Sequence, residues 1–379
     1  MKVLIAGDFC PLYRVGDFIK HGAFETVFNE AKSVVQQADF SLVNLECPVS
    51  GGEMRRIRKC GPNLKCTRKG VEALAWTGFK AVTLANNHFL DFGQNGVVNT
   101  LNSCKQYGLD IVGGGQNLEE ASHILYKEVN EGVLAVINCC EHEFSLATAN
   151  SAGSNPLNPI RQYYAITEAK LKADYVLVIV HGGHEHFQLP SPRMQDTYRF
   201  FIDAGADAVV NHHQHCYSGY EVYKGRPIFY GIGNFCFDEE PIRVDCKWNF
   251  GYMVTIDFQT DNITFKLHPY NQCSSEPVVR MLDDSAFDNS IKQMNAIIAD
   301  RKQLETETKE YFTASLRSSN LTLEPITNRY IRALQNRHLL PEWPFSNRYI
   351  LRLYNFLLCE SHRDKINYFL QYMYDKKNY

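Results

Sequence analysis

The sequence predicts an α/β domain followed by a helical region. Up to about residue 270, short runs of β-branched and other apolar residues alternate with longer polar or amphipathic stretches, the pattern of strands joined by helices. The runs are almost continuously apolar, which is typical of strands buried on both faces. From about residue 275 the apolar residues recur at helical spacing instead. The expected domains are therefore residues 1–272 and a C-terminal helical annex at residues 273–379.

The expected strands are the short apolar runs in the first domain. They lie at residues 3–6, 41–45, 81–84, 133–137, 175–180, 208–210, 227–230, 252–258 and 263–268. In the helical annex, an apolar stripe at helical spacing is formed by Ile366, Phe369, Leu370 and Met373. Three prolines, Pro325, Pro341 and Pro344, would divide the annex into three or four helices because proline breaks a helix.

Composition argues against several classes of protein. Charged residues make up 21% of the chain and the net charge is -3, which is untypical of disordered chains and of nucleic-acid binders with a basic face. No apolar stretch approaches the roughly 18 residues of a membrane-spanning helix, so direct membrane insertion is not expected. The 12 cysteines are irregularly spaced, and without an export signal we expect reduced thiols and a cytoplasmic location.

Polar residues follow several expected strands at the point where each strand ends. They are Asp8, Glu46, Asn87, His88, His181, His213 and His215. The carboxyl ends of strands in an α/β sheet form a ligand crevice, so these side chains are expected to converge. Carboxylates and imidazoles bind divalent transition metals, and two ions about 3.5 to 4 Å apart can support displacement at phosphorus. Six of the 13 histidines lie between residues 181 and 215, and this clustering favours a metal site over isolated structural roles.

Ordered motifs carry a resemblance to a known family. They are Gly7-Asp8, Asn44 to Pro48, Leu84 to His88 with Asp91 and Gly93, Gly113 to Gly115 with Asn117-Leu118, His181 to Glu185, Gly205 to Asp207 followed by His213 to His215, and Gly233 to Phe235. Together they resemble the CapA family of capsule and poly-γ-glutamate synthesis, which is similar to the calcineurin-like metallophosphoesterases. The resemblance covers roughly the first 270 residues. It implies a calcineurin-like four-layer αββα sandwich.

The resemblance also implies a role for each strand-end residue. The implied ligands of two divalent ions (Mn, Zn, Fe or Ni) are Asp8, Cys10, Glu46, Asn87, His181, His213 and His215. Glu46 would bridge the ions, and Cys10 stands where calcineurin-like enzymes carry a histidine. His88 resembles the catalytic histidine that protonates the leaving oxygen, and Asp91 would orient its ring. Asn234 and Glu185 would lie outside the ligand set and support it.

Other residues near the motifs are expected to be structural. His184, His186 and His212 are predicted to have no role, His212 because the alternation of an extended segment would point it away from His213. Gly182 stands where CapA-like sequences usually carry tryptophan, which would open that wall of the pocket. Gly113 to Gly115 are expected to form a turn. The basic run from Arg55 to Lys59 would be a solvated loop, or else lie over the crevice and attract an anionic substrate.

Three functions are compatible with these features. The first is a dimetal phosphoesterase of capsule or cell-surface polymer metabolism, acting on an anionic small molecule or polymer. The second is a γ-glutamyl amide hydrolase or transferase on poly-γ-glutamate, because metal-activated water can attack a carbonyl carbon as well as phosphorus. The third is a non-catalytic component of capsule polymer synthesis. The C-terminal helices would cap the crevice or mediate a homo-oligomer, and no nucleic-acid partner is expected.

Overall fold

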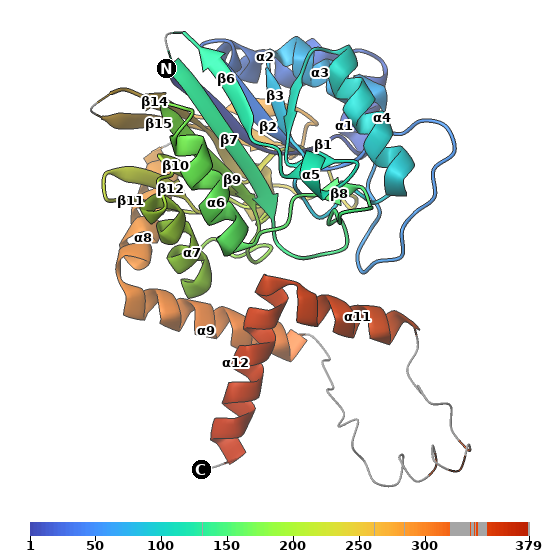
Figure 1. Ribbon diagram of the computed structural model, residues 1–379, viewed down its shortest axis with the longest axis vertical. Coiled ribbons are helices and arrows are strands. Elements are labelled where there is room, and N and C mark those ends of the chain that lie inside the picture. Colours follow the sequence, from blue (N-terminus) through green and yellow to red (C-terminus); the bar gives the residue numbers. More distant parts are fainter. Residues whose placement is uncertain are drawn as a thin grey trace.

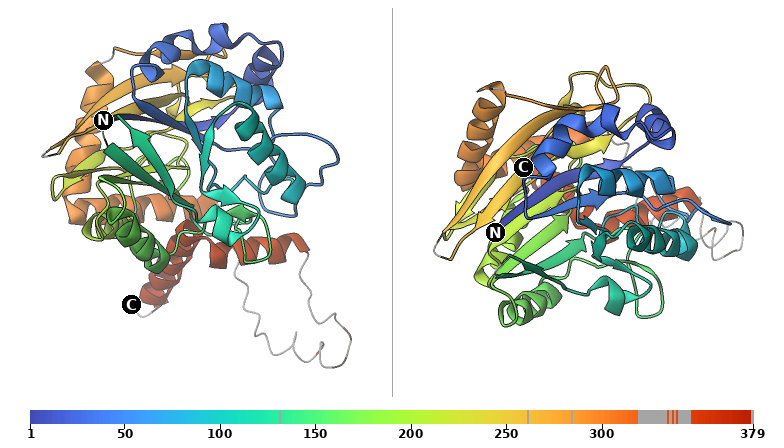
Figure 2. Two further views of the ribbon diagram at one scale, coloured as in Figure 1. Left: turned by 45° about the horizontal axis from the view of Figure 1, so that its top comes forward. Right: turned by 90° about the horizontal axis from the view of Figure 1, so that it is seen from above.

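Two large β-sheets lie face to face, with helices on their outer faces (Figure 1, Figure 2). The computed structural model describes residues 1–318 except 131, 261 and 284, then residues 334, 337, 339 and 347–377. The predicted four-layer αββα arrangement is confirmed. Within the described residues, no helix has the length and apolar character that a membrane span requires.

The first sheet has eight strands and carries the N-terminal strand near its centre. Its strands are β1 (Lys2–Cys10), β2 (Phe40–Leu45), β3 (Ala81–Thr83), β4 (Asp110–Val112), β13 (Asn234–Phe237), β14 (Phe250–Phe258), β15 (Ile263–Gln272) and β16 (Val279–Met281). The order is β16-β15-β14-β1-β2-β3-β4, and β13 also pairs with β1. β1 to β4 are parallel to one another, so β1, β2 and β3 end at the same edge of the sheet.

Helices from the N-terminal third of the chain cover the outer face of this sheet. They are α1 (Tyr13–Lys20), α2 (Phe24–Val35), α3 (Arg68–Thr77) and α4 (Gly93–Gln106). Successive side chains of a strand point to opposite faces. Accordingly, Leu4 and Ala6 of β1 belong to the core under these helices, whereas Val3 and Ile5 belong to the core between the sheets. The first sheet is thus buried on both faces, as its continuous apolar runs predicted.

The second sheet has six strands in the order β11-β12-β10-β9-β7-β6. The strands are β6 (Leu125–Val129), β7 (Gly132–Cys140), β9 (Tyr175–His181), β10 (Ala208–His212), β11 (Tyr220–Tyr223) and β12 (Arg226–Phe229). Helices α6 (Pro159–Lys170) and α7 (Pro192–Asp203) pack on it. Each begins with a side-chain cap, from Asn158 and Ser191, followed directly by proline, a combination that favours a helix start.

All the expected strands overlap observed strands. The short strands β4, β6, β11, β13 and β16 were not predicted, and neither was the small pair β5 (Gly114–Gly115) and β8 (Gly153–Ser154). The shortest helices are α5 (Leu118–Ala121) and the 3-10 turn η1 (Lys247–Asn249). Gly113, just before β5, has a φ of 89°, and a Cβ there would lie 1.9 Å from the Asn138 side-chain oxygen. Close packing therefore explains a glycine at that position.

The predicted change to helices after the sheets is confirmed. The helices are α8 (Ser285–Ala299), α9 (Arg301–Ser318), α11 (Asn347–Leu358) and α12 (Glu360–Lys377). The first sheet continues past residue 272 through β16, and helices begin at Ser285. Pro325, Pro341 and Pro344, which were expected to divide this region, lie outside the described residues.

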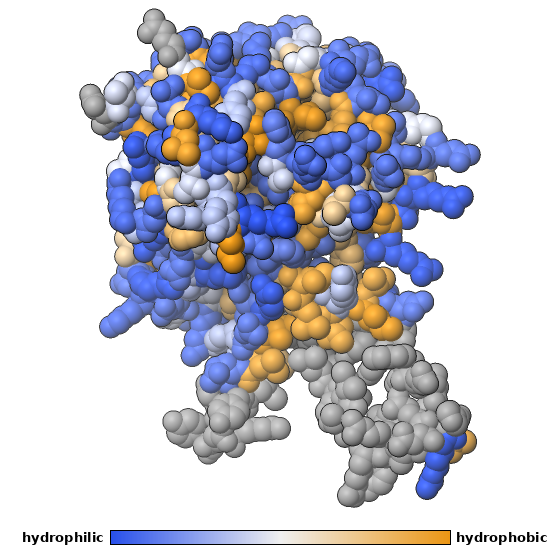
Figure 3. Space-filling model, in the orientation of Figure 1, coloured by the Kyte–Doolittle hydropathy of each residue, from blue (hydrophilic) through white to orange (hydrophobic). Residues whose placement is uncertain are grey.

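The apolar faces of the last two helices are only partly covered. In α12, Ile366 of the expected stripe is buried but Leu370 is 51% exposed, and the Met373 side chain lies outside the described part of the structure. In α11, Ile350, Tyr354 and Leu357 are 42%, 54% and 57% exposed, and apolar residues gather over this helix in Figure 3. The predicted homo-oligomer through these helices stays a prediction.

We expect Gly7→Ala to destabilise the fold strongly. A Cβ on Gly7 would lie 1.9 Å from the carbonyl oxygen of Gly233, so β1 and the segment before β13 would have to separate. Urea unfolding should show a loss of about 3 kcal/mol in the free energy of unfolding. Gly132→Ala is the control, because its Cβ would meet no atom closer than the flexible end of Met1 at 3.2 Å and the Asp174 carboxylate at 3.4 Å. Equal losses in the two variants would contradict the packing argument.

Candidate metal centre

The candidate site lies where strands of both sheets end. Asp8 is near the end of β1, Glu46 directly follows β2, and His181 is the last residue of β9. His213 and His215 follow β10 in the second sheet. The predicted convergence of strand-end residues is therefore observed, and it spans the two sheets.

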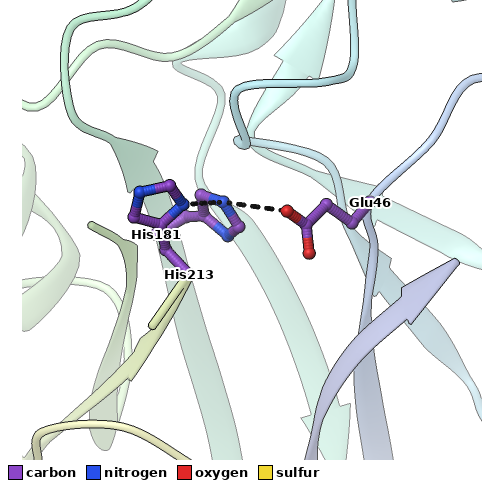
Figure 4. Close-up of side chains that lie close together, drawn as sticks. All are labelled: Glu46, His181 and His213. Atoms are coloured by element: carbon purple, nitrogen blue, oxygen red, sulfur yellow. Dashed lines mark hydrogen bonds and ion pairs between the residues drawn. The ribbon is translucent and has the colours of Figure 1, made fainter. Parts of the chain in front are cut away.

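Three overlapping groups of side chains bring possible ligand atoms within 4.8 Å of one another. The groups are Glu46 with His181 and His213, Asp8 with Glu46 and His215, and Glu185 with His213 and His215. Glu46 Oε1 lies 3.6 Å from His181 Nε2 and 3.7 Å from His215 Nε2. Figure 4 shows the Glu46 carboxylate directed at His181, with His213 beside that ring. Glu46 belongs to two groups, which is the position that a bridging carboxylate needs.

Asp8 is buried and held in its charged form. It accepts hydrogen bonds from Asn44 Nδ2 at 2.7 Å and from the backbone N–H of His213 at 3.1 Å, and its Oδ1 lies 3.0 Å from His212 Nδ1. Burial would raise the pKa of Asp8, but the His212 hydrogen bond and the charges of the nearby imidazoles hold that pKa well below its usual range. An ionised Asp8 is a ready ligand for a cation.

The expectation that His212 points away from the site is wrong. Its ring contacts Asp8, and the reason is the backbone after it. Strand β10 ends at His212, and His213 and His215 have left-handed φ values of 86° and 54°. Strand alternation therefore does not extend past His212, and the turned segment brings all three histidines to the site. Such backbone conformations are unfavourable for residues other than glycine and often occur at functional sites.

Glu46 is the least compensated group in the centre. It is fully buried, and neither carboxylate oxygen has a hydrogen-bond partner among the described residues. Burial, together with the charges of Asp8 and Glu185, raises the pKa of Glu46 well above its usual value. A buried carboxylate without partners is unfavourable unless a cation neutralises it. The donor set of carboxylates, imidazoles and one amide therefore fits divalent transition-metal ions.

Asn87 and two histidines form the other side of the cluster. Asn87 Oδ1 and His213 Nδ1 each lie 3.1 Å from His181 Nε2. Burial, with the charge of His213, lowers the pKa of His181 well below its usual value. A neutral imidazole has a lone pair for a metal, so these atoms are suitable ligands. The structure brings Asn87, His181 and His213 together as predicted.

Cys10 is not part of this cluster, although it was expected to bind the first metal. It belongs to none of the three groups and lies in the core between the first sheet and its helices. The pairing of β1 with β2 shifts register between Ala6 and Asp8, so simple alternation does not place the residues after Asp8. Burial raises the pKa of the Cys10 thiol to about 11. Cys10 is a neutral packing residue in this structure.

The two residues predicted to support the ligands differ in their placement. Asn234 Oδ1 lies 2.8 Å from His215 Nδ1, so it fixes the orientation of that ring from behind. Glu185 lies closer to the ligands than expected. One of its carboxylate oxygens is within 4.8 Å of ring nitrogens of His213 and His215. His184 contacts Phe312 of α9 and Asp364 of α12 instead of the cluster.

His88 has the predicted partner and one that was not predicted. Its Nδ1 lies 2.7 Å from Asp91 Oδ2. Lys59 Nζ lies 3.0 Å from the same Nδ1 and forms an ion pair with Asp91, and only 3% of the Lys59 side chain is exposed. Burial and the charge of Lys59 lower the pKa of His88 to about 4. The expectation of a solvated loop is therefore wrong for Lys59, which lies inside the site.

The loop after β7 contributes two carboxylates that sequence reasoning missed. A Cβ on Gly182 would lie 2.7 Å from Cγ of Glu141, so Glu141 occupies the wall that was expected to be open. Glu143 Oε1 lies 3.9 Å from His213 Nε2. Burial and the charge of Glu185 raise the pKa of Glu143 to about 8. Glu141 directly follows the last residue of β7 and Glu143 comes two residues later, so both carry the strand-end signal that identified the other site residues.

Comparison with protein families assigns this chain to a known family. The family described as bacterial capsule synthesis protein PGA_cap matches residues 2–239, more than half of the chain, and these include all the candidate ligands. The chain belongs to this family. The PGA_cap match ends before β14 and the C-terminal helices.

Two curated relatives carry names linked to capsule synthesis. The chain is 32% identical over 247 residues to the capsule biosynthesis protein CapA of Bacillus anthracis, covering 63% of this chain and 60% of that protein. It is 33% identical over 218 residues to the PGA biosynthesis protein CapA of Bacillus subtilis, covering 57% of each. The chain thus spans about three fifths of the length of these relatives. A solved phosphatase from Mycoplasma pneumoniae is 17% identical with a TM-score of 0.44, covering 76% of this chain and 96% of that one.

We expect Lys59→Met to destabilise the protein far more than a surface lysine substitution. Removal of the ammonium leaves the buried Asp91 carboxylate without its ion-pair partner, which should lower the free energy of unfolding by about 3 kcal/mol. Lys69→Met is the matched control, because Lys69 pairs with Glu72 on the surface and its side chain is 46% exposed. The free energy of unfolding of this variant should fall by less than about 1 kcal/mol. Similar denaturation midpoints for both variants would argue against a structural ion pair at Lys59.

Proposed function

We propose that this chain is a metal-dependent hydrolase of phosphoester bonds that acts in capsule or cell-surface polymer metabolism. The observation that carries the proposal is the buried Glu46 carboxylate, which has no hydrogen-bond partner among the described residues and belongs to two of the possible ligand groups. Membership of the PGA_cap family supports the link to capsule polymers.

The ligand groups suit two ions that share Glu46. Asp8 and His215 would hold one ion with Glu46, and Asn87, His181 and His213 would hold the other. When bound, two divalent ions such as Mn, Zn, Fe or Ni would stabilise negative charge on the substrate oxygens and make a water molecule acidic enough to react near neutral pH. The remaining chemistry depends on side chains of the protein.

His88 is the proposed proton donor to the leaving oxygen. Asp91 contacts its Nδ1, so Nε2 lies on the opposite edge of the ring, where it has no hydrogen-bond partner among the described residues. A bound phosphoester is negatively charged, and its charge favours the protonated ring. The nearby Lys59 ammonium has the reverse effect, so the ring gives up its Nε2 proton readily as the alcohol departs. Lys59 also neutralises Asp91 and thereby keeps the orienting carboxylate in place.

Metal content should depend most on Glu46. Elemental analysis of protein loaded with Mn²⁺ and desalted should give about two ions per chain for the wild type. Glu46→Gln has nearly the same shape but no charge, so both ions should be lost or held much more weakly. His215→Ala should lose one ion and keep the other. A Glu46→Gln protein that retains two ions would contradict the shared-carboxylate arrangement.

His88→Ala should remove catalysis without removing metal. General acid catalysis typically contributes 10²- to 10⁴-fold, so turnover on a phosphoester panel should fall by about that factor while metal content stays unchanged. His123→Ala is the control, because His123 is exposed after α5 and belongs to none of the ligand groups. Full turnover in His88→Ala on every ester that the wild type cleaves would exclude His88 as the proton donor.

An amide bond of poly-γ-glutamate is the second candidate substrate. The name of the B. subtilis relative as a PGA biosynthesis protein favours it. Release of glutamate from polyglutamate by metal-loaded protein, without turnover on the phosphoester panel, would support amide cleavage over the first proposal. Metal binding without cleavage of either bond would point to a non-catalytic role in polymer synthesis.

A further inference from the structure

Helix α12 lies against the candidate metal centre although it is outside the part of the chain that matches the family. In Figure 1 the arrow of β7 points toward the junction of α11 and α12. Cys359, just before α12, has its sulfur 3.9 Å from Glu143 Oε1, and the same oxygen lies 3.9 Å from His213 Nε2. One side chain therefore separates the start of α12 from a candidate metal ligand.

The first turns of α12 are anchored by ionic contacts. The Glu360 carboxylate accepts a hydrogen bond from the backbone N–H of His142 at 2.7 Å and lies 2.5 Å from the His142 ring. Asp364 accepts from Arg193 Nε at 2.8 Å, and the same guanidinium donates to Glu141 at 2.7 Å. Of these partners, Glu141 and His142 belong to the loop after β7, and Arg193 lies at the start of α7. The orientation of α12 is therefore fixed relative to the metal ligands.

Two residues on one face of α12 carry hydrogen-bond donors beside this centre. His362 and Lys365 are three residues apart, so they are neighbours on the helix surface. Asn355 Nδ2 lies 3.2 Å from His362 Nδ1, and an amide nitrogen can only donate, so a neutral His362 carries its proton on Nε2. Burial and the charge of Lys365 lower the pKa of His362 to about 4, which keeps the ring neutral.

Lys365 is partly buried, and no carboxylate of the described residues forms an ion pair with it. Its ammonium lies 5.2 Å from the centre of the Tyr311 ring, and Tyr311 donates a hydrogen bond to the backbone oxygen of Glu185 at 2.8 Å. Lys59, by contrast, is already paired with Asp91. Burial lowers the pKa of Lys365, and the charge of Glu185 opposes that effect. A desolvated ammonium of this kind is stabilised by an incoming anion.

We propose that Lys365 and His362 form a subsite for an anionic group of the substrate, a phosphate or a carboxylate, beside the metal centre. The proposal rests on the proposed function, because the subsite would position the substrate whose bond is cleaved at the metals. It places a determinant of substrate choice on a helix that the family match does not include. Lys365 would supply charge, and His362 would supply a neutral N–H that favours a defined orientation of the anion.

The test uses full-length protein loaded with Mn²⁺ and two probes, inorganic phosphate and glutamate. Binding is measured by calorimetry in the wild type and in Lys365→Met, Lys365→Gln and Lys365→Arg, after metal content and thermal unfolding are checked. The two neutral variants should bind the preferred probe about tenfold more weakly with unchanged metal content, and Lys365→Arg should recover most of the affinity. Lys309→Met is the control, because Lys309 is exposed on α9, and it should bind like the wild type.

Phosphoester turnover separates this proposal from the proposed reaction. A raised KM with little change in kcat in Lys365→Met would support the subsite, as would weaker phosphate binding in a protein that cleaves no ester. Weaker phosphate binding without ester cleavage would support the subsite and contradict the proposed phosphoesterase activity. Preference for glutamate over phosphate would assign the subsite to a carboxylate. Unchanged affinity for both probes in folded, metal-loaded Lys365→Met or Lys365→Gln would overturn the subsite, and so would a wild type that binds neither probe.

Discussion

Two carboxylates, Asp8 and Glu46, are buried next to each other at the strand ends, and the rest of the centre depends on how their charges are compensated. Asp8 receives hydrogen bonds from the protein, including one from Asn44, whereas Glu46 receives none from the described residues. Removal of a carboxylate from water without compensation costs several kcal/mol. Glu46 therefore fits the fold only as a protonated acid or as a ligand of cations, and the imidazoles around it favour the second state.

The same carboxylate pair links the two sheets. Asn44, which hydrogen-bonds Asp8, lies on β2 of the first sheet, while His212 lies at the end of β10 in the second. The sheets pack through a common apolar core that includes Val3, Ile5 and most of β9 and β10. A shift of one sheet against the other would separate Asp8 from His212 and Glu46 from His181. The spacing of the metal ligands thus depends on the packing of the apolar core between the sheets.

Sequence reasoning located the site residues whose position depends on the end of a strand, such as Asp8 and His181. It did not place Cys10, because a register shift within β1 decides which way that side chain faces. It misplaced His212 because the left-handed backbone of the following residue ends the strand alternation. For Lys59 the basic run offered placement over the crevice only as one of two alternatives, and Lys365 had no local signal. They reach the site from a loop and a distant helix, and only tertiary packing brings them there.

The loop after β7 contacts both the part of the chain that matches the family and the helices that follow it. Glu143 contacts both His213 and Cys359, while Glu141 accepts from Arg193 and from the backbone N–H of Ser361 in α12. Each carboxylate therefore has one side toward the domain and one toward the C-terminal helices. A change in how α12 packs would move Glu143 and alter the charge beside His213. The C-terminal helices thus contact the surroundings of the metal centre through Glu141 and Glu143, even though every candidate ligand precedes residue 239.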